Sequence, residues 1–231
     1  MAEFANSQDT LGIAFKNPSL LQQALVHRSY LHENPDSALL SNERMEFLGD
    51  SLLGFVIAEK LYRDFPDLSE GGMTKLRAAL VRKETLARLA SSLRLGDYLY
   101  LGRGEEFSGG RTKQSVLARA FESLVGAILM DQGFAIAKDF VLRLFDGEIR
   151  MAIEEKLTTD YKSRLQEIVQ ASHRVTPIYR TIKEVGPDHA KEFTVEVIVG
   201  GSVIGRGHGK SKRVAEMEAA RDALQGLAQE Q

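Results

Sequence analysis

The sequence predicts a chain of two domains, an all-α domain over residues 1–155 and a small α+β domain over residues 161–229. Three observations predict this class. Apolar residues recur at helical spacing in the first region, and no strand pattern appears before residue 175. Beyond that point, apolar and polar residues alternate, which is typical of half-buried strands. Residues 156–160, KLTTD, form a short polar segment that we interpret as a linker.

The all-α domain is expected to begin with short helices over 11–15 and 19–27, followed by a turn-rich loop. Pro66 and Asp67 end the next helix, and Ser69 can cap the one after it. Four glycines within residues 102–110 indicate a loop. The remaining helices are expected over residues 42–64, 69–89, 114–130 and 135–155.

The second domain is expected to fold in the order α-β-β-β-α. Phe193, Val195, Val197 and Val199 alternate with polar residues, and Gly200-Gly201 is a hairpin signal. The expected elements are a helix over 161–171, strands over 178–185, 192–199 and 202–206, and a helix over 211–227.

The helix over 42–64 carries three carboxylates in an otherwise apolar segment. At about 100° per residue, Glu43, Glu46 and Asp50 fall within an arc of roughly 60° and project from one face. Clustered acids cost free energy unless a positive charge lies among them, so a divalent metal is a simple explanation. The alternative is a solvated acidic stripe.

Glu122 lies in the middle of a segment, ARAFESLVGAILM, that is apolar nearly all round and should be buried. A metal shared with Glu46 and Asp50 would satisfy its charge. The alternative is an ion pair with Arg119, three residues earlier, which is worth only a few tenths of a kcal/mol on an exposed helix. That pair alone would not offset the burial of Glu122.

NERMEFLGDSLL, residues 42–53, closely resembles the signature of ribonuclease III, the double-stranded-RNA endonuclease. The resemblance implies Mg²⁺, or Mn²⁺ in its place, held by Glu46, Asp50 and Glu122. Asp50 and Glu122 would be catalytic, and Glu43 and Glu70 outer-shell acids. It also implies a homodimer, products with 5′-phosphate and 3′-hydroxyl ends, and substrates among ribosomal RNA precursors and structured messenger and transfer RNA.

The sequence departs from this family at Arg119, where similar enzymes usually have an aspartate. An arginine cannot ligate a metal. It could turn away and leave three carboxylates and waters for Mg²⁺, or it could lie among the acids and weaken metal binding. The second case suggests an alternative function, a double-stranded-RNA-binding dimer with attenuated or lost cleavage.

The second domain resembles a double-stranded-RNA-binding domain in its element order, in GPDHAKEF between the first two strands and in GKSKRVAE at the start of the last helix. Such domains bind A-form RNA by shape, across two minor grooves and the phosphates between them. The resemblance implies RNA contacts from three segments, the first helix, the loop between the first two strands and the start of the last helix: Ser163, Gln166, Glu167 and Gln170; Pro187, Asp188 and His189; and Lys210, Lys212 and Arg213.

Several function classes are disfavoured by what the sequence holds. It has no cysteine, which excludes disulfides and thiolate zinc sites, and its net charge of −2 places any RNA affinity in local clusters. Its N-terminus does not read as a secretory signal and its most apolar run is too short to span a bilayer, so we expect a cytoplasmic chain without a membrane partner. Between Gly205 and Gly209 lie three residues, not the four of a phosphate-binding loop, so no nucleotide cofactor is expected.

Overall fold

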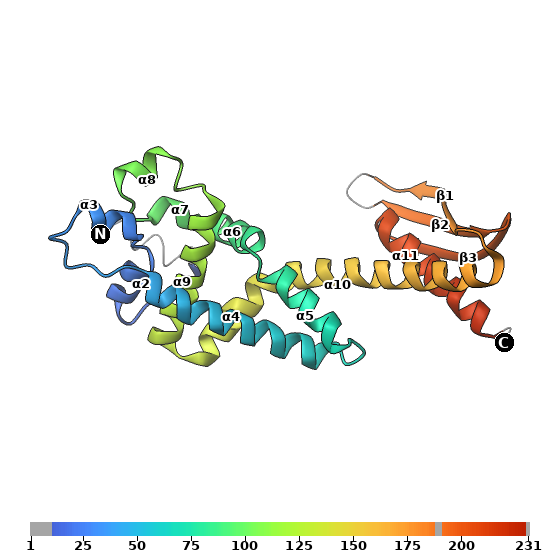
Figure 1. The fold of residues 1–231 in the computed structure, drawn as a ribbon, viewed down its shortest axis with the longest axis horizontal. Helices are drawn as coiled ribbons and strands as arrows, with labels where there is room; N and C mark the ends of the chain where they lie inside the picture. Colours follow the sequence, from blue (N-terminus) through green and yellow to red (C-terminus); the bar gives the residue numbers. More distant parts are fainter. Residues whose placement is uncertain (1–10, 188–190, 230–231) are drawn as a thin grey trace. The chain divides into compact units, whose positions relative to one another are not determined.

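The computed structural model describes residues 11–187 and 191–229, and it divides into two compact units between Ile149 and Arg150 (Figure 1). The first unit is helical, and the second joins a three-stranded antiparallel sheet to helices. The predicted fold class is therefore confirmed. Within the described ranges, every helix is too short or too polar to cross a membrane.

The helical unit contains eight described helices before the long helix that follows them, and α4 and α9 form its centre. Both are lined by fully buried side chains, among them Leu53, Ile57, Phe121 and Leu124. The bounds are α2 Pro18–Ala24, α3 Arg28–Glu33, α4 Glu43–Asp64, α5 Glu70–Leu80, α6 Lys83–Ser92, α7 Leu95–Tyr98, α8 Arg103–Phe107 and α9 Gln114–Gln132.

Three expected boundaries in this unit were wrong, each because of a contact distant in sequence or an unforeseen cap. The helix near 19–27 ends at Ala24, since Tyr100 donates its N–H to the Leu25 carbonyl. The helix over 69–89 is two helices, and the Thr85 hydroxyl donates to the Ala79 carbonyl at their junction. The loop at 102–110 contains α8, whose first amides donate to the Glu33 carboxylate.

The polar segment 156–160 is helical, since α10 runs continuously over Phe134–His173. The helices expected over 135–155 and 161–171 are therefore joined into one. No proline or second glycine follows Gly147 within this helix, so nothing in the backbone forces it to stop. The two compact units divide within α10.

In the second unit, β1 Ile178–Val185, β2 Glu192–Val199 and β3 Ser202–Gly209 form the sheet, and α11 spans Lys212–Gln229. β3 is longer than expected because the Gly205, Gly207 and Gly209 stretch stays extended under α11. A Cβ at Gly207 would lie 2.1 Å from the Ala215 carbonyl oxygen. The glycines at every second position of the strand therefore let α11 pack directly on the sheet.

The opposite face of this sheet is crossed by one charged row. Arg180, Glu196 and Arg206 are direct partners in the register of β1, β2 and β3. Glu196 is only 5 % exposed, and both arginines bond its carboxylate, at 3.0 and 2.8 Å. Both bonds lower the pKa of the Glu196 carboxyl, and the bond from Arg180 has the larger effect.

Candidate active site and nucleic-acid interface

Two glycines allow α4 and α9 to approach until their backbones touch. A Cβ on Gly49 would lie 1.7 Å from the Glu122 carbonyl oxygen, and one on Gly126 would lie 2.3 Å from that of Met45. Neither position has room for a side chain. The contact places the acidic face of α4 beside the centre of α9.

The predicted acids of these two helices line one cavity of about 310 Å³. Because Glu46 and Asp50 are four residues apart, they lie on the same side of α4, and Glu122 reaches the cavity from α9. The structure thus brings together side chains that are 72 or more residues apart in sequence. The full lining is Glu43, Glu46, Phe47, Asp50, Arg119 and Glu122.

Glu122 is the electrostatic centre of this cavity. Burial, followed by the charges of Asp50 and Glu46, raises the pKa of its carboxyl to about 7, and Arg119 opposes the shift. Burial also raises the pKa of Glu46. The carboxylates therefore repel one another in partly desolvated surroundings, which an added positive charge would relieve.

Arg119 forms its ion pair across the helix contact. Its Nε lies 3.6 Å from Oε1 of Glu46, so the interaction joins α9 to α4 and does not follow the i,i+3 spacing to Glu122. With the Arg119 side chain 49 % exposed, this pair is partly screened by water.

The chemistry of this donor set fits a hard divalent cation, because carboxylate oxygens are the ligands that Mg²⁺ prefers. Glu122, whose pKa is raised by burial and then by its acidic neighbours, favours the same conclusion. In the side-chain positions of the described residues, however, no group of three or more His, Cys, Asp or Glu is arranged to hold one metal ion.

The two predicted outer-shell acids lie in different places. Glu43 lines the acidic cavity, where the Ser41 hydroxyl donates to it at 3.0 Å. Glu70 lines a separate pocket of about 240 Å³ beside α5, and its carboxylate accepts from the Thr74 hydroxyl at 3.1 Å. The structure does not bring Glu70 to the other acids.

In the second unit, one face of α10 is exposed and polar. Leu165 and Val169 are buried against the sheet and α11, so the side of the helix away from them faces outward. The four predicted RNA-binding residues of this helix are all exposed: Ser163, Gln166, Glu167 and Gln170. Pro187 is exposed at the end of β1, whereas Asp188 and His189 lie outside the described residues.

The start of α11 carries the predicted basic cluster. Lys210, Lys212 and Arg213 are exposed, and Ser211 caps the helix by accepting from the Val214 N–H at 3.2 Å. Lys212 lies 3.6 Å from Glu184 and 5.6 Å above the Phe193 ring centroid. These contacts hold its long side chain near the sheet while its charge stays accessible.

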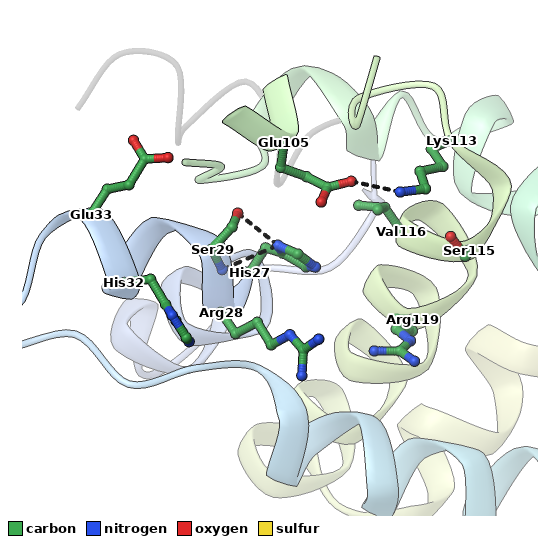
Figure 2. Close-up of a pocket in the computed structure, with 10 residues that line it drawn as sticks. All are labelled: His27, Arg28, Ser29, His32, Glu33, Glu105, Lys113, Ser115, Val116 and Arg119. Atoms are coloured by element: carbon green, nitrogen blue, oxygen red, sulfur yellow. Dashed lines mark hydrogen bonds and ion pairs between the residues drawn. The ribbon is translucent and has the colours of Figure 1, made fainter. Parts of the chain in front are cut away.

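Sequence reasoning missed a second cavity in the first unit, of about 570 Å³, between α3, α8 and the start of α9 (Figure 2). His27, Arg28 and Lys113 are among its lining residues, and Arg119 lines both this cavity and the acidic one. The signal available in the sequence was the polar donors at residues 27–29 and 111–115, which lie at the starts of two separate helices.

A helical unit that gathers acids from two helices, followed by an α-β-β-β-α unit, defines a class of proteins that join a nuclease-like domain to an RNA-binding motif. The family model for a ribonuclease-III-like domain matches residues 17–147, and the model for the double-stranded RNA binding motif matches residues 161–227. The chain belongs to the ribonuclease III family.

Its relatives match over nearly the whole chain. Ribonuclease 3 of Dehalococcoides mccartyi strain 195 is 48 % identical over 225 residues, which cover 97 % of this chain and 95 % of the relative. Ribonuclease 3 of Desulforamulus reducens is 50 % identical over 226 residues, covering 97 % and 92 %. A solved nuclease domain of ribonuclease III from Campylobacter jejuni is 40 % identical, with a TM-score of 0.57 over 61 % of this chain and 94 % of that domain.

Proposed function

We propose that the protein is a metal-dependent endoribonuclease that hydrolyses phosphodiester bonds of double-stranded RNA. One observation carries the proposal: carboxylates from α4 and α9 line one cavity, and the pKa of Glu122 is raised to about 7 among them. The relatives named ribonuclease 3 support the same reaction class.

In this proposal, Glu46, Asp50 and Glu122 would hold Mg²⁺, or Mn²⁺ in its place. When bound, such an ion supplies positive charge to the scissile phosphate and makes water a stronger nucleophile. The chain contributes three carboxylates from two helices in close contact, and side-chain rotation into the cavity would bring their oxygens together. The half-buried position of Glu122 strengthens every charge interaction there.

The second unit would supply the affinity for duplex RNA. The exposed polar face of α10, Pro187 and the basic start of α11 are the surfaces that such a domain would place on the minor grooves and phosphates. Products with 5′-phosphate and 3′-hydroxyl ends, and substrates among ribosomal RNA precursors and structured messenger and transfer RNA, complete the proposal.

An alternative function is favoured by the ion pair of Arg119 with Glu46. While the guanidinium lies near that carboxylate, it competes with a divalent ion for one of the proposed ligands. The alternative is a double-stranded-RNA-binding protein whose cleavage is attenuated or lost.

Cleavage of a labelled RNA duplex in Mg²⁺ or Mn²⁺ tests both functions. Under the primary proposal, the native chain cuts the duplex and Glu122→Gln reduces cutting at least a hundredfold, while the exposed Glu84→Gln on α6 cuts normally. If the native chain only shifts the duplex and Arg119→Asp cuts it, the alternative is correct. Normal cutting by Glu122→Gln would remove the acidic cavity from the mechanism.

We also propose that the protein is a homodimer, with Phe47 and Leu48 of α4 at the contact. Phe47 is 77 % exposed. The solved nuclease domain of ribonuclease III from Campylobacter jejuni has structural flexibility in a region involved in dimer formation. Phe47→Asp is expected to halve the mass measured by light scattering. Phe107→Asp is the matched control, because Phe107 is 98 % exposed on α8 and lies outside the proposed contact. An unchanged mass for Phe47→Asp would contradict the placement.

A further inference from the structure

The cavity between α3, α8 and α9 adjoins the acidic cavity through Arg119, which lines both. Its walls carry basic and hydrogen-bonding side chains from three separate segments of the first unit (Figure 2). What such a cavity can bind depends on which of its polar groups already form hydrogen bonds or ion pairs with other residues of the protein.

His27 presents a hydrogen-bond donor to this space. Its Nδ1 accepts from the Ser29 N–H at 3.3 Å and lies 2.8 Å from the Ser29 hydroxyl. Because that hydroxyl accepts from the Gly102 N–H, its own hydrogen is left for Nδ1. Burial lowers the pKa of His27 and favours the neutral ring, so its single proton lies on Nε2.

The two acidic residues in the wall are each occupied by donors of the wall itself. The Glu33 carboxylate accepts the backbone N–H groups of Arg103 and Gly104, at 2.8 and 3.2 Å. Glu105 pairs with Lys113 at 3.0 Å. Neither carboxylate is therefore left to neutralise the remaining cations of the cavity.

Those cations are Arg28 and Arg119, whose guanidinium groups turn toward the same space in Figure 2. Their partners lie on α4 at long distances, 3.9 Å from Arg28 to Glu43 and 3.6 Å from Arg119 to Glu46. Two guanidinium groups that converge in this way repel each other, and these long contacts with carboxylates offset the repulsion only in part, so a further anion between them would be favourable. A phosphate matches the fork of donors that each guanidinium presents.

We propose that this cavity is a subsite for a phosphate group of the RNA strand, held by Arg28, Arg119 and the Nε2–H of His27. The inference rests on the proposed function, because it takes the strand through the acidic cavity and places a neighbouring phosphate here. Arg119 exchanges its contact with Glu46 for that phosphate, which frees the carboxylate for the other cavity.

The test measures binding without cleavage, using the full chain in EDTA and a labelled RNA duplex across a series of salt concentrations. Arg28→Gln is expected to weaken binding about tenfold and to reduce the slope of log K against log salt by about one, since one phosphate contact is lost. Arg63→Gln is the matched control, because Arg63 is an exposed arginine within α4 that pairs with Glu59 of the same helix, at 2.8 Å, and it lies outside the lining of this cavity. It is expected to bind like the native chain.

Two forms of the duplex distinguish the source of the phosphate. If Arg28→Gln loses affinity for both the 5′-hydroxyl and the 5′-phosphate duplex, the bound group is an internal phosphodiester. If it loses affinity for the 5′-phosphate duplex alone, the bound group is the phosphate at a strand end. Equal affinity and slope for Arg28→Gln and the native chain would overturn the subsite, even if the native chain cuts RNA. Conversely, an Arg28-dependent slope in a chain that never cuts would refute the proposed function and leave the subsite standing. A native chain that does not bind the duplex overturns both.

Discussion

Replacing Gly49 with alanine tests whether the close contact of α4 and α9 builds the acidic cavity. The added Cβ would lie 1.7 Å from the Glu122 carbonyl oxygen and 3.0 Å from the Gly126 nitrogen. Both are backbone atoms of a helix, so no side-chain rotation can relieve the overlap. The helices must move apart.

The expected free-energy change combines two opposing effects. Alanine in place of glycine favours a helix by about 1 kcal/mol, whereas forced overpacking of a core costs about 1–3 kcal/mol and occasionally more. Because the overlap here is with backbone, we expect the upper end of that cost and a net loss of about 2 kcal/mol. In a protein of this size, that loss lowers the melting temperature by about 4–8 °C.

Gly54→Ala provides the matched control on the same helix. A Cβ there meets nothing within 4 Å, so the helix-propensity gain is unopposed and stability should rise by up to about 1 kcal/mol. The measurement is urea unfolding in EDTA, followed by RNA cleavage at 25 °C. A Gly49→Ala chain as stable and as active as the Gly54→Ala chain would refute the reasoning about the helix contact.

Two further predictions follow from the same physics. Gly207→Ala should displace α11 from the sheet and lower the hydrogen-exchange protection of β2, whereas Gly226→Ala, with open space at its Cβ, should preserve it; equal protection in the two variants would contradict the packing. In EDTA, Glu122 binds its proton more tightly in the folded chain, with a pKa of about 7 against 4.5, so folding stability should fall as pH rises between these values. The difference in unfolding free energy between native and Glu122→Gln chains should show this trend, and a difference that is constant from pH 4 to pH 8 would rule it out.

Most of the fold could be predicted because local periodicity and burial agree along most of the chain. The alternation of Val195, Val197 and Val199 predicts β2, and all three are buried in the structure. The errors fall where a tertiary contact or an unforeseen cap decides the outcome. Glu33 caps α8 from 70 residues away, and the pairing of Tyr100 with residue 25 ends α2, so neither boundary has a local signal.

The acids of the candidate site could be predicted because carboxylates are conspicuous in apolar helices, but their surroundings could not. Gly49 and Gly54 cannot be told apart from the sequence, since both are single glycines in the same helix. Only the position of α9 shows that Gly49 makes a tight contact and Gly54 faces open space. The partner of Arg119 likewise depends on the second helix. Spacing along α9 suggested Glu122, whereas the packing of α4 offers Glu46 to the same guanidinium.

Arg119 links the two cavities by charge. An acid at this position would add a fifth negative side chain to the acidic cavity and leave Arg28 as the cation facing the other one. The arginine instead reduces the repulsion on Glu122 and places a second guanidinium beside Arg28. The Arg119 guanidinium cannot bind the Glu46 carboxylate and a phosphate in the other cavity equally well at the same time. Occupation of one cavity should therefore weaken the hold of Arg119 on the other, so that RNA and a divalent cation each favour the binding of the other.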